Sequence, residues 1–196
     1  MTRGRPITFS PDEAIGAAVR VFWERGYDRA STRDLLAAMR ISRSSLYQAF
    51  GNKEQLFLEA LQCYRLSLIE RLGRRLEAAP SAMAFLEALF HDTADEAGSE
   101  RAALGCLIFN SAGELGQRDD LPSRQAQQSL AAISKIFHRA ICQAQAEGHI
   151  APDRDAEALA SYLTMGMAGL RTLLKSGADA GQARRGVEVL LETLRR

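Results

Sequence analysis

The fold is decided by residues 31–50, which read STRDLLAAMRISRSSLYQAF. Two short stretches with apolar residues at helical spacing each follow a serine, Ser31 or Ser42, and serine is among the preferred residues for capping a helix N-terminus. The pattern predicts two short helices separated by a turn at residues 39–42. The residues expected to face the core are Leu35, Leu36, Met39, Leu46 and Phe50.

Longer helices are predicted on both sides of this pair. Before it, Ser10 and Glu13 have the pattern of a capped helix start, and Gly26 is expected to end that helix. After it, Asn52 predicts the cap of a long fourth helix that runs to Pro80. The first helix is expected to bury Ile15, Val19 and Phe22, with Ala14 and Ala18 beside them. A longer helix followed by two short ones is the layout of a helix-turn-helix.

The rest of the chain also has a helical pattern, because alternating β-branched runs are nearly absent and Ala, Leu, Arg, Glu and Gln dominate. Further helices are predicted near residues 82–96, 104–112, 122–147, 155–175 and 182–196. We therefore predict an all-α protein with two domains. A helix-turn-helix domain is expected at residues 1–53 and a larger helical domain at residues 54–196, with the fourth helix belonging to both.

The formal net charge of +1 hides an asymmetry. Residues 1–53 hold nine Lys and Arg against five Asp and Glu, whereas residues 54–196 hold sixteen against nineteen. A basic front on a mildly acidic body favours a polyanion partner for the front only. Chance clustering of solvated charges is the alternative that the charges alone leave open.

Several classes of protein lack support in the sequence. The N-terminus has no apolar stretch of signal-peptide length, and the longest uncharged run, residues 158–170, is too short to span a membrane, so we expect a soluble cytoplasmic protein with no membrane partner. The three cysteines and three histidines are scattered without the spacing of a disulfide framework or a metal site, and no cofactor is expected. An enzyme with a cysteine nucleophile would need a positioned histidine base, and no local signature supports one.

Four segments resemble, in order and spacing, the DNA-binding domain of TetR-family transcription regulators. They are residues 22–27 (FWERGY), 31–36 (STRDLL), 41–50 (ISRSSLYQAF) and 52–56 (NKEQL). The resemblance implies a sequence-specific repressor that binds an approximately palindromic operator as a homodimer and leaves it when a small-molecule effector binds. An architectural DNA-binding protein without an effector is an alternative, although it would not need so large a body. The family commonly has glycine in the turn where this chain has Arg40.

The third helix is expected to read the DNA bases. Arg43 and Gln48 fall on its outward face, where an arginine can pair bidentately with guanine and a glutamine with adenine. The small hydroxyls of Ser44 and Ser45 allow close approach to DNA. The resemblance implies that Tyr47 contacts a phosphate.

Further phosphate contacts are expected at helix N-termini, which favour anions. Thr32 and Arg33 begin the second helix, and Lys53 begins the fourth. Ahead of the first helix, Arg3 and Arg5 lie on a basic arm. This arm either enters a minor groove or is a solubilising tail.

The resemblance implies that the C-terminal helices form the dimer interface and enclose an effector pocket. Residues 163–170 combine small residues with adaptable methionines, and the last helix carries one apolar stripe. The candidate interface residues are Gly166, Gly169, Leu170, Val187, Leu190 and Leu194. On the pattern alone, burial within the monomer explains these residues equally well.

The segment Gly105-Cys106-Leu107 resembles one TetR subgroup, some of whose members sense electrophiles or small organic acids. The predicted pocket residues are Cys106, Phe109, Asn110 and Lys175. At helical spacing Phe109 and Asn110 would share a face with the thiol, and an ammonium from Lys175 would favour the reactive thiolate. Cys106 is therefore either a sensing atom, which would make the protein an electrophile- or redox-sensing repressor, or a small buried hydrophobe.

Overall fold

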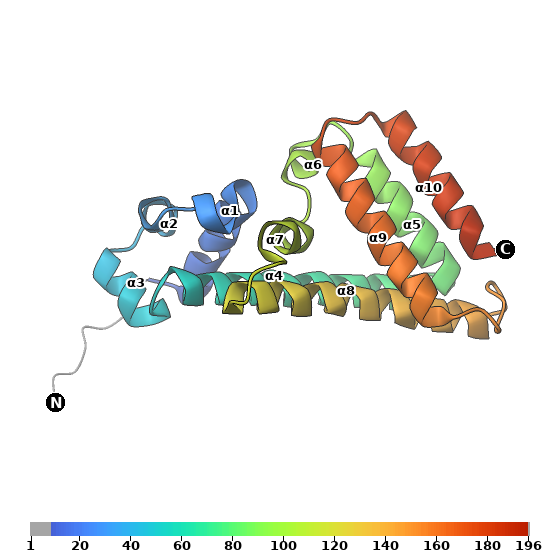
Figure 1. The fold of residues 1–196 in the computed structure, drawn as a ribbon, viewed down its shortest axis with the longest axis horizontal. Coiled ribbons are helices and arrows are strands. Elements are labelled where there is room, and N and C mark those ends of the chain that lie inside the picture. The colour runs from blue at the N-terminus through green and yellow to red at the C-terminus, as the bar shows by residue number, and fades with distance from the viewer. Residues whose placement is uncertain (1–8, 196) are drawn as a thin grey trace.

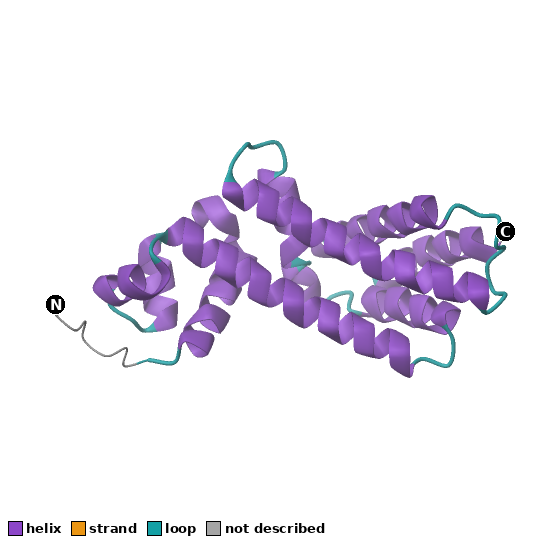
Figure 2. Ribbon diagram, turned by 90° about the horizontal axis from the view of Figure 1, so that it is seen from below, coloured by secondary structure: helices purple, strands orange, loops and turns teal. Residues whose placement is uncertain are grey.

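The computed structural model describes residues 9–195, so the predicted arm with Arg3 and Arg5 lies outside the described residues. Every regular element in this range is an α-helix, as predicted (Figures 1 and 2). The helices are α1 (Pro11–Arg29), α2 (Thr32–Met39), α3 (Arg43–Phe50), α4 (Lys53–Ala78), α5 (Ala82–Asp95), α6 (Glu100–Leu104), α7 (Leu107–Leu115), α8 (Leu121–Ala146), α9 (Ala156–Lys175) and α10 (Ala180–Arg195). Within residues 9–195, none of them is long and apolar enough to cross a bilayer.

Two long helices, α4 and α8, run along the length of the molecule and pack against each other (Figure 1). The short helices α2 and α3 gather with α1 at one end, and α5, α9 and α10 stand together at the other end, near the C-terminus. Because α4 packs against both α1 and α8, a single helix belongs to both parts of the molecule.

The starts of the first four helices are fixed locally. At each, a side chain accepts a hydrogen bond from the backbone N–H three residues ahead, which satisfies one of the donors that a helix start leaves unpaired. The capping residues are Ser10, Ser31, Ser42 and Asn52. Asp34 also accepts from the N–H of Ser31 at 3.1 Å, so α2 begins with a complete capping box. The boundaries of the helix-turn-helix therefore come from local sequence.

The buried face of α1 differs from the prediction. Its buried residues are Ala14, Ala18, Val21 and Phe22. Ile15 and Val19 are only partly buried, as is Leu36 on α2. The reason is that α1 packs against α2, α4 and α7, so its apolar face is turned toward several neighbours. The first helical segment ends at Gly26 as predicted, with a φ of 79°, but a further short turn follows through Arg29, so α1 is kinked at this glycine.

The helix predicted near residues 104–112 begins later, as α7, and a short helix that was not predicted, α6, precedes it. Gly105 has a φ of 69°, so α6 ends at Leu104 and α7 begins at Leu107. Cys106 occupies the capping position of α7 in an extended conformation. Cys106 is therefore not part of the helix, and the prediction that it shares a helical face with Phe109 and Asn110 does not apply.

Three residues predicted for the dimer interface belong to the core of the chain itself. Leu170, Val187 and Leu194 are 7%, 2% and 0% exposed, because α10 packs against α5 and α9. Gly166 faces Leu190 so closely that a Cβ added to the glycine would lie 2.1 Å from the leucine side chain. This pair joins α9 to α10 within the monomer.

Arg40 is the one non-glycine residue with a positive φ among the described residues, at φ 55° and ψ 40°. This conformation costs an L side chain about 1–2 kcal/mol, part of which glycine loses again through its freedom in the unfolded chain. We expect Arg40→Gly to raise the free energy of unfolding by about 1 kcal/mol and the thermal midpoint by about 2–4 °C. Urea and thermal unfolding measure this. Arg40→Ala is the control, since it removes the same charge but keeps Cβ; an equal gain in both variants would contradict the strain explanation.

Candidate functional site

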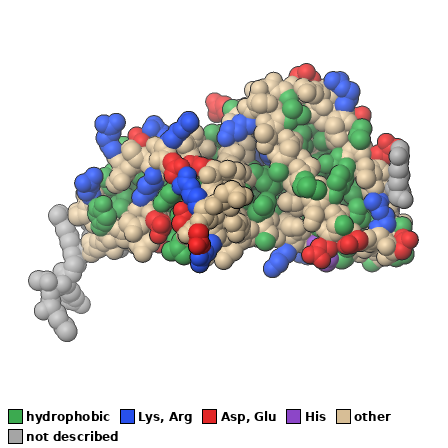
Figure 3. Space-filling model, viewed as in Figure 1, with side chains coloured by type: hydrophobic (Ala, Val, Ile, Leu, Met, Phe, Trp, Pro, Cys, Tyr) green, Lys and Arg blue, Asp and Glu red, His purple; other side chains and the backbone are tan. Residues whose placement is uncertain are grey.

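The outward face of α3 is polar and accessible. Leu46 and Phe50 anchor the helix against the core, with 1% and 5% of their surface exposed. The exposed residues of the other face are Arg43, Ser44, Tyr47 and Gln48. Basic side chains gather over the end of the molecule that α1–α3 form (Figure 3). This face therefore presents the groups that pair with base edges in a major groove.

Three hydroxyls lie together at the start of α3. The Oγ atom of Ser42 lies 2.8 Å from that of Ser44 and 2.9 Å from that of Ser45, and it accepts from the backbone N–H of Ser45 at 3.1 Å. A helix N-terminus favours an anion. The predicted DNA contacts Ser44 and Ser45 thus lie where a DNA phosphate could bind. Such a contact would replace the hydrogen bond that each hydroxyl now shares with Ser42.

The predicted phosphate contacts occupy two further helix starts. Thr32 and Arg33 begin α2, and Arg33 is exposed. Lys53 begins α4, but its ammonium is engaged within the protein. It donates to the carbonyl oxygen of Asp28 at 3.3 Å and lies 4.6 Å from the ring centroid of Tyr27. Lys53 therefore also fixes α4 to the end of α1.

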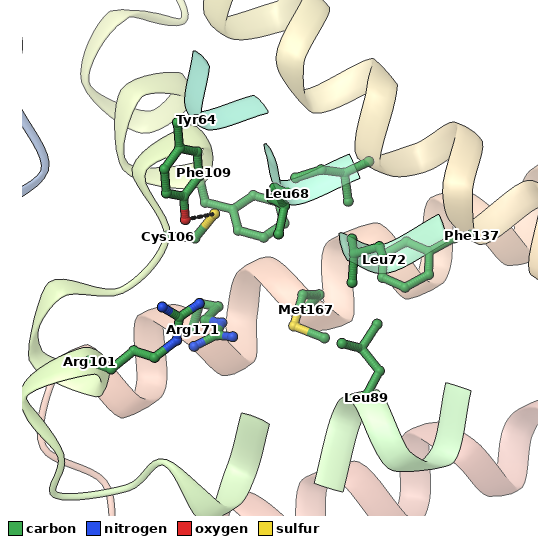
Figure 4. A pocket seen from close by; sticks show the side chains of 11 residues that line it. Tyr64, Leu68, Leu72, Leu89, Arg101, Cys106, Phe109, Phe137, Met167 and Arg171 are labelled. Atoms are coloured by element: carbon green, nitrogen blue, oxygen red, sulfur yellow. Dashed lines mark hydrogen bonds between the residues drawn. The ribbon is translucent and has the colours of Figure 1, made fainter. Parts of the chain in front are cut away.

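A small, partly open cavity with a free volume of about 40 Å³ lies between α4, α5, α7, α8 and α9 (Figure 4). This volume is well below the usual range for ligand sites, so a larger molecule must move one of its walls to enter. Apolar walls are formed by Leu68, Leu72, Leu89, Phe109, Phe137 and Met167. The polar side chains of the lining are Tyr64, Arg101, Cys106 and Arg171. Arg101 lies on α6 and reaches the cavity from outside the five helices that surround it.

Two of the four predicted pocket residues line this cavity and two do not. Cys106 and Phe109 are part of its wall. Asn110 instead turns back and donates from Nδ2 to the last carbonyl of α6 at 2.8 Å. Lys175 is exposed, and its stem lies 3.2 Å from where a Cβ on Gly105 would stand. For Asn110 the break at Gly105 is the physical reason, because α7 begins anew at Leu107 and the side chain of Asn110 closes the end of α6. Lys175 is the last residue of α9 and lies outside the lining on that helix.

The thiol of Cys106 has a tyrosine as its hydrogen-bond partner. The hydroxyl of Tyr64 donates to Sγ at 3.7 Å (dashed line in Figure 4), and Cys106 is only 6% exposed. Burial, reinforced by the neighbouring thiol, raises the pKa of Tyr64 above its ordinary value of 10.0. The phenol is therefore a neutral donor at physiological pH, in the place where an ammonium was predicted.

The two arginines of the cavity were missed in the sequence. They lie side by side in Figure 4, and both pair with one carboxylate: Arg101 Nε lies 3.2 Å from Glu96 Oε1, and Arg171 Nη1 donates to Glu96 Oε2. Arg171 directly follows the uncharged run 158–170. A single charged residue at the end of such a run could have indicated a buried charge in the C-terminal domain. Arg101 lies on a five-residue helix, which is too short to show any period.

The last turn of α7 lies against the break in α1. Because Gly26 leaves helical geometry, the next N–H groups behave like those of a helix start. The carboxylate of Glu114 accepts both, from Tyr27 at 2.9 Å and from Asp28 at 2.8 Å. A Cβ at position 26 would lie 2.6 Å from Glu114 Oε2, so glycine is needed both for its φ and for this close approach.

An ion pair supports the same corner. Arg118, just beyond α7, donates from both Nη atoms to the carboxylate of Asp28, at 2.9 Å for one oxygen and still closer for the other. The guanidinium holds the pKa of Asp28 below its usual value, so the pair is charged at neutral pH. With Lys53 on the carbonyl of the same residue, Asp28 links the end of α7 to the start of α4.

Comparisons with known proteins agree with this arrangement. Residues 14–60 match the family model for bacterial regulatory proteins of the tetR family, and residues 82–190 match the model for a tetracyclin repressor-like C-terminal domain. The uncharacterized HTH-type transcriptional regulator YezE of Bacillus subtilis (strain 168) is 30% identical, over 97% of this chain and 99% of YezE. The HTH-type transcriptional repressor ComR of Escherichia coli (strain K12) is 31% identical, over 91% of this chain and 85% of ComR.

A solved structure is similar over the whole fold. It contains a cysteine mutant of the TetR family transcriptional regulator CifR, complexed with 26-bp double-strand operator DNA. The TM-score is 0.84 at 31% identity, covering 97% of this chain and 100% of that chain. On the family models and these relatives, the chain belongs to the TetR family of bacterial regulatory proteins.

Proposed function

We propose that this regulator is a repressor that binds an approximately palindromic operator as a homodimer and leaves it when a small molecule fills the cavity. The observation that carries the proposal is the course of α7. Its start lines the cavity through Cys106 and Phe109, and its last turn holds α1 through Glu114. One helix therefore joins this small apolar cavity to the part of the molecule that carries the DNA-reading face.

The reading function rests on α3. Arg43 and Gln48 are the groups proposed to read bases, and Tyr47 is proposed to contact a phosphate. The proposal is supported by the exposure of all three side chains on one short, capped helix. It is also supported by the similarity to CifR, whose structure includes operator DNA, and to the repressor ComR.

The release mechanism follows from what a ligand must displace. A ligand changes DNA affinity only if it favours one arrangement of the protein over another. A molecule larger than the free space must move a wall, and α7 is the wall that is bonded to α1. A shift of Phe109 is thus passed to the backbone of Tyr27 and Asp28 through Glu114.

Dimerisation is proposed through the outer surfaces of α9 and α10. Met165 and Val189 are large apolar residues with 66% and 65% of their surface exposed. Each stands one position before a residue of the Gly166–Leu190 contact that joins the two helices. Gly169 is also exposed, with no atom within 4 Å of an added Cβ, which leaves room for a partner helix.

Two alternatives use the same fold. An electrophile entering the cavity would meet Cys106, and CifR was solved as cysteine mutants. Two observations count against a reactive thiolate. The thiol accepts a hydrogen bond from the neutral hydroxyl of Tyr64, and Lys175, whose charge would favour the thiolate, does not line the cavity. An architectural DNA-binding protein would need no cavity linked to its reading face. We therefore favour release by a reversibly bound ligand.

Base reading is tested on α3. We expect Arg43→Ala and Gln48→Ala each to lose about 1–3 kcal/mol of discrimination at particular base pairs, because each removes a bidentate contact. Tyr47→Phe should weaken binding to all sequences alike, since it removes only a phosphate contact. Selection of binding sites from random DNA, followed by titration of single-base variants, measures both effects. Unchanged base preference in Arg43→Ala would mean that α3 does not read the operator in this register.

The dimer surface is tested by charge. Val189→Asp and Met165→Asp should give monomers by light scattering and should weaken operator binding, because a buried unpaired carboxylate opposes association. Leu66→Asp is the matched control, since Leu66 is 57% exposed but lies on α4. Val189→Asp and Met165→Asp proteins that both remain dimers would place the interface elsewhere.

Coupling through α7 is tested by a double-mutant cycle. Leu68→Trp fills the cavity and should weaken operator binding about tenfold, within the usual range for coupled sites, whereas Leu66→Trp on the same helix faces solvent and should not. Glu114→Gln replaces one of the two accepting oxygens by an NH₂ donor, so the two N–H groups can no longer each bind an oxygen of their own. In that background the effect of Leu68→Trp should fall to about threefold or less, and an undiminished effect would exclude Glu114 as the link. Circular dichroism checks that each variant is folded.

A further inference from the structure

The cavity has a polar end and an apolar end. In Figure 4 Arg101 and Arg171 lie together on one side, near Cys106 and Tyr64, whereas Leu72, Leu89 and Phe137 lie on the other. Among the described residues, no Asp or Glu belongs to the lining. The shape of the lining therefore suits a molecule with a polar head and an apolar tail.

The charges at the polar end do not balance. Two guanidiniums share the single carboxylate of Glu96, and the other acceptor near Arg171 is the neutral hydroxyl of Thr93, at 3.4 Å from Nη2. The side chain of Arg171 is only 13% exposed, so water screens its charge poorly, whereas Arg101 is 44% exposed and partly screened. One positive charge is thus left over at the edge of an apolar cavity, where a single negative charge would be stabilised.

We propose, on the basis of the proposed function, that the effector is a small aliphatic monocarboxylate. Its carboxylate is held at the end formed by Arg101 and Arg171, and its tail lies between Leu72, Phe137 and Met167. A guanidinium presents paired N–H donors that match a planar carboxylate. One spare positive charge fits a monoanion better than a phosphate dianion. The free volume of about 40 Å³ favours a short tail, whose entry moves a wall of the cavity as the proposed function requires.

The chain carries its own reporter of this event. Trp23 is the single tryptophan of the sequence, and its ring lies 5.1 Å from the ring of Tyr64 and 5.6 Å from Cζ of Arg101. Its Nε1 atom is buried, with no hydrogen-bond partner among the described residues. A ligand that draws Arg101 toward its carboxylate changes the surroundings of this indole, and with them its fluorescence.

The test is a fluorescence titration of the full chain with four ligands of one length at fixed ionic strength: hexanoate, hexanamide, hexan-1-ol and hexylammonium. We expect a saturable change with hexanoate, about tenfold or more weaker binding of the amide and alcohol, and no binding of the ammonium ion. Equal binding of hexanoate and hexanamide, or no binding of hexanoate, would overturn the proposal. Operator binding is measured on the same preparations without ligand, so a failure of the repressor function would be seen separately.

Two substitutions with opposite expected effects make the test independent of folding defects. Arg171→Met should weaken hexanoate binding about tenfold or more, whereas Arg124→Met, at an exposed arginine outside the cavity lining, should not. Glu96→Gln frees both guanidiniums and should tighten hexanoate binding. A mere loss of structure would weaken binding in both cavity variants, so weaker binding in Glu96→Gln would contradict the proposed role of the spare charge.

Discussion

The carboxylate of Glu114 on the two N–H groups of the α1 break is the interaction on which the rest of the structure depends. Without it, the half-buried N–H of Tyr27 would lose a charged acceptor, at a cost of about 1.5–3 kcal/mol, and the exposed N–H of Asp28 would turn to water. It also requires glycine at position 26, because a side chain there would meet the carboxylate. The kink in α1 and the position of α7 are therefore a single feature, formed by residues far apart in the sequence.

In the proposed mechanism, the shortness of α7 makes it an effective connection between the cavity and α1. Between Leu107 and Leu115 it spans about 13 Å at the usual helical rise. The bond from Asn110 to the end of α6 fixes its first turn, and Glu114 fixes its last. A short helix held at both ends moves as a rigid body. A displacement of its cavity-lining residues would therefore also displace its last turn, which is bonded to α1.

The helix-turn-helix could be predicted from sequence because its signals are local. Ser31, Ser42 and Asn52 each cap a helix within three residues, and the αL turn at Arg40 follows the family pattern even without glycine. The cavity could be predicted only in part. Cys106 and Phe109 were found, but Asn110 bonds to the end of α6 after the break at Gly105, and a positive φ at one glycine leaves no periodic signal. Lys175 lies at the exposed end of α9, a tertiary placement that helical spacing does not show.

Burial was the harder part to predict for the C-terminal helices. The stripe of Val187, Leu190 and Leu194 has the same spacing whether it faces α5 and α9 or a second subunit, because both surfaces are apolar. The structure assigns Val187 and Leu194 to the monomer core and leaves Val189 exposed between them. Amphipathic spacing identifies a face that must be covered, and only tertiary contacts decide what covers it.

Two routes from the cavity converge on α1. Through α7, Glu114 holds the backbone of Tyr27, and through α6, Arg101 lies over the ring of Trp23. Trp23 precedes the break at Gly26 and Tyr27 follows it, so the two contacts lie on either side of the kink in α1. A cation that leaves an aromatic face gives up about 0.5–2 kcal/mol, which is comparable to the coupling free energies that ordinary allosteric proteins use. A ligand that engages Arg101 and displaces Phe109 would therefore act on α1 on both sides of this kink.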